Sequence, residues 1–99
     1  METELDKETN TDEEIKEPSM YKVFILNDDY TPMDFVMDVL YHVFNKSPEQ
    51  AFSIMKDAHE KGSSMVGAYT LQIAETKVER ALSASKEKGF PLQFNIEEE

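Results

Sequence analysis

A largely apolar stretch at residues 21–26 (Tyr-Lys-Val-Phe-Ile-Leu) runs directly into a polar segment at residues 27–33 (Asn-Asp-Asp-Tyr-Thr-Pro-Met). The apolar stretch alternates like a strand whose two faces are both mostly apolar, which is typical of a central strand covered on both sides. Beyond the polar segment, apolar residues recur every three or four positions, as on the buried side of a helix. These residues are Phe35, Val36, Val39, Leu40, Val43 and Phe44. Segment 27–33 must therefore turn the chain from a strand into a helix, and it carries three acceptor side chains.

Two dipeptides mark the starts of helices. Thr31–Pro32 and Ser47–Pro48 each place a good N-cap residue before a proline, which is favourable at the first helical position. Asp34 completes a spacing like that of a capping box after Thr31. A bend is therefore expected at residues 45–46, and Gly62 is expected to end the second helix because glycine adopts the left-handed conformation easily.

The rest of the chain predicts three more elements. A second strand is expected at 65–70, a third helix at 71–88 closed by Gly89, and a last strand at 92–96, where apolar and polar residues alternate. The order β-α-α-β-α-β lacks strict alternation of strands and helices. It predicts a small α+β domain in which a three-stranded antiparallel sheet packs against three helices.

The first 17 residues differ from the rest in composition. They hold eight acidic and two basic side chains, with Leu5 and Ile15 as the apolar residues beyond Met1. Such a segment buries too little apolar surface to offset the entropy lost on ordering. We therefore expect residues 1–17 to form a disordered acidic N-terminal arm and residues 18–99 to form the folded domain.

Composition excludes several classes of function. The net charge of −11 and the scattered bases are unlike a nucleic-acid-binding surface. No apolar run approaches the ~20 residues of a membrane span, and no signal peptide is recognised at the acidic N-terminus. The absence of cysteine fits a reducing compartment. We expect a cytoplasmic protein that interacts with neither nucleic acid nor membrane.

The sequence also lacks the patterns of an enzyme. It contains no nucleophile elbow, no glycine-rich phosphate loop and no His-Glu-x-x-His zinc motif. The spacing of His42 and His59 relative to Asp28 and Asp29 matches no familiar set of metal ligands. We therefore expect no catalysis, no metal and no cofactor.

A binding site uses the same residues better. A protonated amine is a compact cation with three hydrogen-bond donors, so its receptor should present converging acceptors. Asn27 and Asp28 offer acceptors in the turn, and a neutral His59 offers a third. Helix residues provide a candidate apolar lining: Met33, Val36, Met55 and Ala58. From the residues alone, two alternatives remain open: these side chains serve only the turn and the core, or the chain is a general acidic interaction domain without an amine pocket.

Four motifs in a common order then resemble the ClpS family. They are residues 18–23, residues 27–33, His59 shortly before Gly62, and residues 74–78. ClpS is the bacterial adaptor that presents N-degron substrates to the ClpA or ClpC unfoldase of the Clp protease, and the resemblance runs from about residue 18 to residue 96. It implies a monomeric adaptor core domain at 18–99 that binds a first residue Leu, Phe, Tyr or Trp, docks on the unfoldase's N-terminal domain and delivers the substrate for degradation by ClpP.

The resemblance also implies roles for individual residues. Asn27, Asp28 and His59 would bind the free α-amino group, with Asp29 in a supporting role. The side-chain pocket would be shaped by Thr31, Met33, Val36, Met55, Ala58 and Leu92, with Met33 as a gate against β-branched residues. The surface that docks on the unfoldase would include Gln72, Glu75, Thr76 and Lys77, and the acidic arm would engage the unfoldase during handover.

Two positions depart from the family pattern. Ala58 stands where a larger aliphatic residue is common, which predicts a roomier pocket and a shifted preference among first residues. Gln72 stands where some relatives have an acid, which predicts a weaker or redirected contact with the unfoldase.

Overall fold

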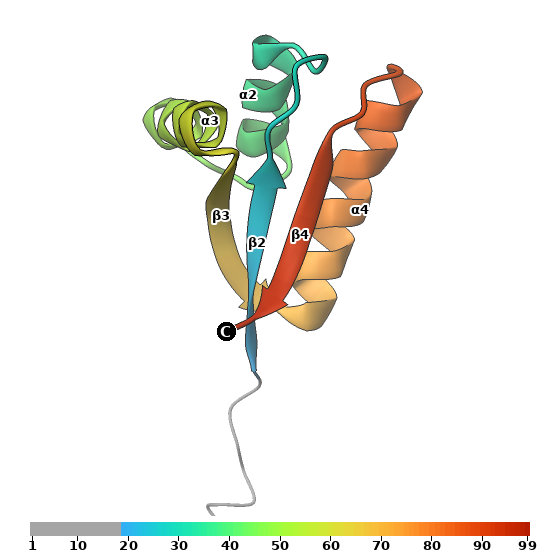
Figure 1. Ribbon diagram of the computed structural model, residues 1–99. Helices are drawn as coiled ribbons and strands as arrows, with labels where there is room; N and C mark the ends of the chain where they lie inside the picture. The colour runs from blue at the N-terminus through green and yellow to red at the C-terminus, as the bar shows by residue number, and fades with distance from the viewer. Residues whose placement is uncertain (1–18) are drawn as a thin grey trace, which may run out of the picture.

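The computed structural model describes residues 19–99, and the predicted acidic arm at 1–17 lies outside the described residues (Figure 1). The elements follow one another as β2 (Met20–Leu26), α2 (Met33–His42), α3 (Pro48–Lys61), β3 (Ser63–Thr70), α4 (Leu71–Glu87) and β4 (Gln93–Glu98). This is the β-α-α-β-α-β order that the sequence predicts.

The sheet has the strand order β3-β2-β4, and both pairings are antiparallel. The antiparallel sheet and the central position of the first strand are therefore confirmed. Val23 lies opposite Gly67 and Phe24 lies opposite Met65, so Val66 is an extra residue on β3. Such a bulge increases the local twist of a strand pair.

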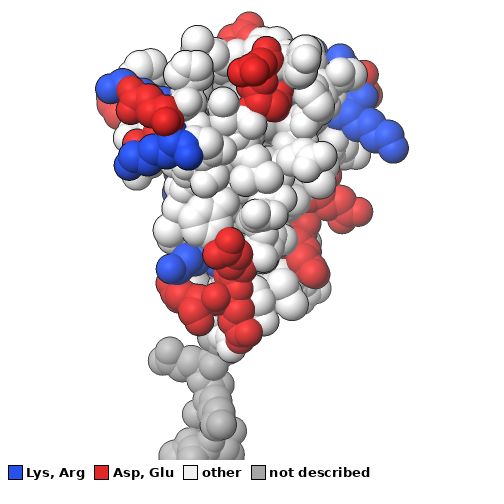
Figure 2. All heavy atoms as spheres, in the orientation of Figure 1, with Lys and Arg blue, Asp and Glu red and all other residues white. Residues whose placement is uncertain are grey.

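Helix cover differs between the two faces of the sheet. Val23 and Ile25 are buried on the face against which α4 packs (Figure 1). Lys22, Phe24 and Leu26 point to the other face and stay partly exposed, and no helix of residues 19–99 covers them (Figure 1). The expectation of cover on both sides was wrong, because an antiparallel sheet can leave one face to water. Figure 2 shows this face as mostly uncharged, with acidic side chains gathered at its lower end.

The core lies between the sheet and the helices. All three helices and all three strands adjoin it, and its buried apolar residues are Val23, Ile25, Val39, Leu40, Phe44, Ala51, Ala58, Val66, Ala74, Val78, Ala81 and Leu92. The contributions of α3 and α4 are mainly alanines, which let each helix approach its neighbours closely.

The start and end of α3 are as predicted. The Ser47 hydroxyl accepts a hydrogen bond from the Gln50 backbone N–H at 3.1 Å. The Gln50 side chain accepts one from the Ser47 N–H at 3.0 Å, which completes a capping box. The helix ends at Gly62, whose φ of 95° lies in the left-handed region that glycine adopts without strain.

The start of α2 differs from the prediction. The N-cap is Pro32, not Thr31, and it makes no side-chain capping bond. The Asp34 carboxylate accepts from the next N–H, that of Phe35, and so completes no capping box. The reason lies one turn earlier, where the Asp28 side chain takes both the N–H and the hydroxyl of Thr31.

Candidate functional site

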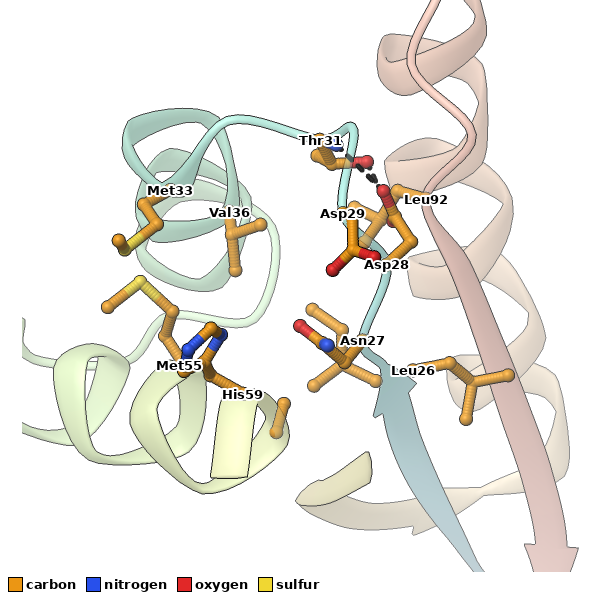
Figure 3. A pocket seen from close by; sticks show the side chains of 12 residues that line it. Leu26, Asn27, Asp28, Asp29, Thr31, Met33, Val36, Met55, His59 and Leu92 are labelled. Atoms are coloured by element: carbon orange, nitrogen blue, oxygen red, sulfur yellow. Dashed lines mark hydrogen bonds between the residues drawn. The ribbon is translucent and has the colours of Figure 1, made fainter. Parts of the chain in front are cut away.

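A cavity of about 210 Å³ opens where β2 ends, between the turn that follows it and helices α2 and α3 (Figure 3). Its lining residues are Ile25, Leu26, Asn27, Asp28, Asp29, Thr31, Met33, Val36, Met55, Ala58, His59 and Leu92. The structure thus brings together every residue that the sequence suggested for the amine and the side-chain pocket. Sequence reasoning missed Ile25 and Leu26, because apolar residues in a central strand are indistinguishable from core residues.

A backbone hydrogen bond joins the two segments that carry Asn27 and His59. The Asn27 N–H donates to the carbonyl of Gly62 at 2.9 Å, which joins the end of β2 to the end of α3. His59 lies in the last turn of α3, so this bond brings it beside Asn27 although the two are far apart in sequence. The Asn27 amide and the His59 ring face the same space (Figure 3). Both are acceptors when the ring is neutral.

Asp28 is engaged within the turn. Its Oδ1 accepts from the N–H groups of Tyr30 at 2.8 Å and Thr31 at 2.7 Å, and its Oδ2 accepts from the Thr31 hydroxyl at 2.8 Å. Burial raises the pKa of the Asp28 carboxyl, but the bonds from the Thr31 N–H, the Tyr30 N–H and the Thr31 hydroxyl outweigh it. The pKa therefore lies below its ordinary value. Asp28 is a charged anchor of the turn.

Asp29 points the other way. Its carboxylate turns from Thr31 toward the space shared by Asn27 and His59 (Figure 3). Asp29 is exposed, and within residues 19–99 no other group hydrogen-bonds to its side chain. Its oxygens are therefore the carboxylate acceptors that the turn leaves free.

Apolar side chains from three segments also line the cavity. Val36 comes from α2, Met55 and Ala58 come from α3, and Leu92 precedes β4. Ala58 and Leu92 are almost fully buried, whereas Met33 at the start of α2 keeps 62% of its surface exposed. The side chains of Met33 and Met55 approach each other at one end of the cavity (Figure 3). The site thus joins a polar, acidic corner to a hydrophobic recess.

The lining includes neither lysine nor arginine. In the part of the chain that the structure describes, no group of three or more His, Cys, Asp or Glu side chains is placed to hold a metal ion. His42 does not line the cavity; its ring lies edge-on to that of Tyr41, with 4.8 Å between centroids. The cavity lining therefore combines acceptor side chains with apolar side chains and contains no cationic one apart from a protonated His59.

The predicted docking residues lie on the first half of α4, at the opposite end of the sheet from the cavity (Figure 1). Gln72, Glu75 and Thr76 are exposed, and the Thr76 hydroxyl donates to the Gln72 carbonyl at 2.9 Å. Lys77 is half-buried, and other contacts occupy its ammonium. It donates to the Val43 carbonyl at 3.0 Å and to Asn45 Oδ1 at 3.2 Å, and it lies 5.7 Å from the centre of the Tyr69 ring. Lys77 thus connects α4 to the bend between α2 and α3.

Comparison with known proteins agrees with this architecture. A family model described as ATP-dependent Clp protease adaptor protein ClpS matches residues 16–95. The ClpS adapter protein of Maricaulis maris is 48% identical over 91 residues, which cover 92% of this chain and 84% of that protein. The ClpS adapter protein of Oleidesulfovibrio alaskensis is 48% identical over 96 residues, which cover 97% and 92%.

A solved structure is also similar. The structure of Agrobacterium tumefaciens ClpS2 bound to L-phenylalaninamide matches with a TM-score of 0.80 and 47% identity, over 84% of this chain and 100% of that chain. The chain belongs to the ClpS family, a family of Clp protease adaptors and not of enzymes. None of the helices in residues 19–99 is long and apolar enough to cross a membrane.

Proposed function

We propose that this protein binds the free N-terminal residue of N-degron substrates and delivers them to the ClpA or ClpC unfoldase for degradation by ClpP. The preferred first residues are Leu, Phe, Tyr and Trp. One observation carries the proposal: a single cavity of about 210 Å³ is lined both by the acceptor side chains of Asn27, Asp29 and His59 and by apolar side chains from α2 and α3. A free α-amino group bonded to a large apolar side chain has matching chemistry.

The α-ammonium group belongs at the acidic corner. Its three N–H donors match three acceptors, which we assign to the Asn27 amide oxygen, the Asp29 carboxylate and the neutral His59 ring. The sequence assigned this role to Asp28, with Asp29 in support. The hydrogen bonds from Tyr30 and Thr31 to Asp28 favour the reverse division, in which Asp28 holds the turn and Asp29 receives the amine.

The apolar recess accepts the first side chain. Val36, Ala58 and Leu92 form its walls, and the small side chain of Ala58 leaves room for an aromatic ring. Met33 lies at the rim of the cavity. A ligand whose first residue is branched at Cβ would collide with it, whereas a longer unbranched first side chain would pass. The ligand of the similar Agrobacterium protein, L-phenylalaninamide, has a free amine and an aromatic side chain, which supports this assignment.

The free energies are consistent with selective and moderate binding. Burying one large apolar side chain contributes about 1.5–3 kcal/mol. Each charge-assisted hydrogen bond contributes roughly 1.5–3 kcal/mol, and association costs at least about 4 kcal/mol. The upper end of these contributions corresponds to micromolar affinity, or about −8 kcal/mol. Losing either half of the ligand should therefore abolish useful binding.

The exposed part of α4 is proposed to dock on the N-terminal domain of the unfoldase through Gln72, Glu75 and Thr76, with Lys77 beside them. These residues lie at the far end of the sheet from the cavity (Figure 1). A monomer in the cytoplasm can therefore hold a substrate and the unfoldase at the same time. Because the ammonium of Lys77 is partly committed to Val43 and Asn45, its docking contact is expected to be the weaker one.

Titration with fluorescent peptides tests the binding proposal. A peptide that begins with Phe should bind, and the same peptide with an acetylated N-terminus should bind at least about 100-fold more weakly, because acetylation removes the positive charge and two of the three N–H donors. Peptides that begin with Leu, Tyr and Trp should bind like the Phe peptide, and those that begin with Ile, Val and Glu should not. Equal affinity for free and acetylated peptides would contradict the proposal and favour a general acidic interaction domain.

A further inference from the structure

The cavity wall contains the most exposed methionine of the described chain. Met33 exposes 62% of its surface, compared with 43% for Met65 and 38% for Met20. Met37 and Met55 are only partly exposed. The sequence has six methionines and no cysteine, so thioethers are its only sulfur groups. A thioether open to solvent is the sulfur group that peroxides reach first.

Met33 also stands where a chemical change has the largest effect on a ligand. Its side chain meets that of Met55 at the apolar end of the cavity (Figure 3). Val36, which lines the cavity from the same helix as Met33, is aliphatic, and neither it nor Met55 offers a hydrogen-bond donor from its side chain. Asn27, Asp28 and Asp29 lie across the cavity from Met33, whereas the His59 ring lies beside Met55 (Figure 3).

We propose that Met33 is a peroxide-sensitive modification site whose oxidation to the sulfoxide weakens the binding of apolar N-terminal residues. The site is thereby a target for hydrogen peroxide or an organic hydroperoxide. In the reaction, a sulfur lone pair attacks one peroxide oxygen, the S–O bond forms and the O–O bond breaks. The sulfur loses two electrons, and the proton of the transferred O–H oxygen passes to the departing oxygen, so the peroxide is reduced to water or an alcohol.

The physical reason for weaker binding is desolvation. The sulfoxide oxygen is a strong acceptor that water solvates in the free protein. An apolar side chain entering the recess would strip that water, and neither Val36 nor Met55 provides a donor to replace it. We expect the affinity for a Phe-initial peptide to fall roughly tenfold or more. This inference rests on the proposed function of the same cavity.

The test uses the full chain and hydrogen peroxide. Peptide mass spectrometry follows the oxidation of each methionine with time, while fluorescence anisotropy follows the affinity for a Phe-initial peptide in the same samples. Met33 should be oxidised ahead of Met65 and Met20, and affinity should fall in step with the Met33 sulfoxide. Treatment with methionine sulfoxide reductases should restore it.

Leucine variants locate the effect. The quantity compared is the ratio of affinities before and after oxidation within each variant, so a change in starting affinity does not matter. The ratio should be close to one in Met33→Leu. Met65→Leu, which lies outside the cavity, should lose affinity on oxidation as the original protein does. Met55→Leu should also lose affinity on oxidation, since Met33 is still present.

Three results would overturn the inference: oxidation of Met33 no earlier than that of Met65, full affinity when Met33 is oxidised, or an undiminished loss in Met33→Leu. A protein that binds no free N-terminus before oxidation would contradict the proposed function, and this inference with it. Binding that survives oxidation of Met33 would contradict this inference alone.

Discussion

The starts of α2 and α3 share a pattern of hydroxyl residue and proline but use it differently. At α3, the Ser47 hydroxyl and the Gln50 side chain cap the helix in the usual reciprocal way. At α2, the Thr31 hydroxyl turns back to Asp28, and the helix begins at Met33 with no side-chain cap. The start of α3 is held by a side-chain cap, whereas the start of α2 lacks one because the Thr31 hydroxyl donates to Asp28 in the turn beside the cavity.

The start of α2 differs from that of α3 because Asp28 and Thr31 hold the turn beside the cavity. With Asp28 fixed by three hydrogen bonds, the next carboxylate along the chain, that of Asp29, is directed into the cavity (Figure 3). The two adjacent aspartates are therefore proposed to have separate roles, Asp28 in the stability of the turn and Asp29 in binding. Substitutions at Asp29 and Asp28 test this separation of roles, and a substitution at Ser47 tests whether the start of α3 affects stability alone.

The largest effect is expected from Asp29→Ala. It removes one charge-assisted hydrogen bond to the ligand, worth about 1.5–3 kcal/mol, so affinity for a Phe-initial peptide should fall roughly 10- to 100-fold. The melting temperature should not change, because no described residue hydrogen-bonds to this side chain. Asp38→Ala, which removes an exposed charge of α2 outside the cavity, is the matched control and should bind normally. Equal losses in both variants would indicate a general charge effect.

Asp28→Ala should chiefly lower stability. Three donors of the turn lose their acceptor, and the free energy of unfolding should fall by about 1–3 kcal/mol in urea titrations. Affinity should also fall, because the turn that directs Asp29 is no longer held. The division of roles would be contradicted if Asp28→Ala kept full stability and lost binding alone.

Ser47→Ala should affect stability without affecting binding. Loss of an N-cap typically costs about 1 kcal/mol, and the capping box of α3 is remote from the cavity lining. Urea titration and peptide anisotropy measure the two quantities. Ser53→Ala, at an exposed position within the same helix, is the control and should not destabilise, since alanine is the better helix former. Weaker peptide binding by Ser47→Ala would show that the two helix starts are not independent.

The smallest effect is a pH dependence. In the folded protein, burial acts to raise the pKa of the Asp28 carboxyl, but the hydrogen bonds from Thr31 and Tyr30 outweigh it. The pKa therefore lies below its ordinary value, so folding favours the charged form. The resulting stability is present above the unfolded-state pKa and is lost as pH falls through the folded-state pKa. The stability difference between the original protein and Asp28→Asn should therefore be constant from about pH 7 to pH 5 and shrink toward pH 3. A difference that grows on acidification would contradict the assignment.

Local patterns predicted the features that depend on neighbouring residues. The element order, the Ser47 cap and the end of α3 at Gly62 all follow from hydrogen bonds or backbone preferences within about four residues. The pattern at Thr31 failed because Asp28 competes for the same hydroxyl, and both outcomes satisfy local rules.

Features that depend on packing were harder to predict. The sheet face that carries Phe24 and Leu26 is left without a helix because the helices pack on the other face. The alternation of apolar residues in β2 does not specify on which face the helices pack. Ile25 and Leu26 line the cavity because β2 ends there, although the Leu26 side chain points away from it (Figure 3). The direction of the Asp29 carboxylate follows from the shape of the turn. Most residues of the cavity could be predicted from the sequence. The different orientations of the Asp28 and Asp29 carboxylates could not.

The bond from the Asn27 N–H to the Gly62 carbonyl has a consequence for experiments on this site. Because both atoms belong to the main chain, no side-chain truncation deletes the link, and a scan of alanine substitutions over the cavity would miss it. The spacing between Asn27 and His59, two of the three residues proposed to bind the amine, is thus set by the main chain. The proposed site is therefore preorganised, and little binding free energy is lost in ordering it when a ligand binds. Only a residue that strains the left-handed backbone at Gly62, such as valine, would expose this hidden contribution, as a loss of affinity with every cavity side chain still in place.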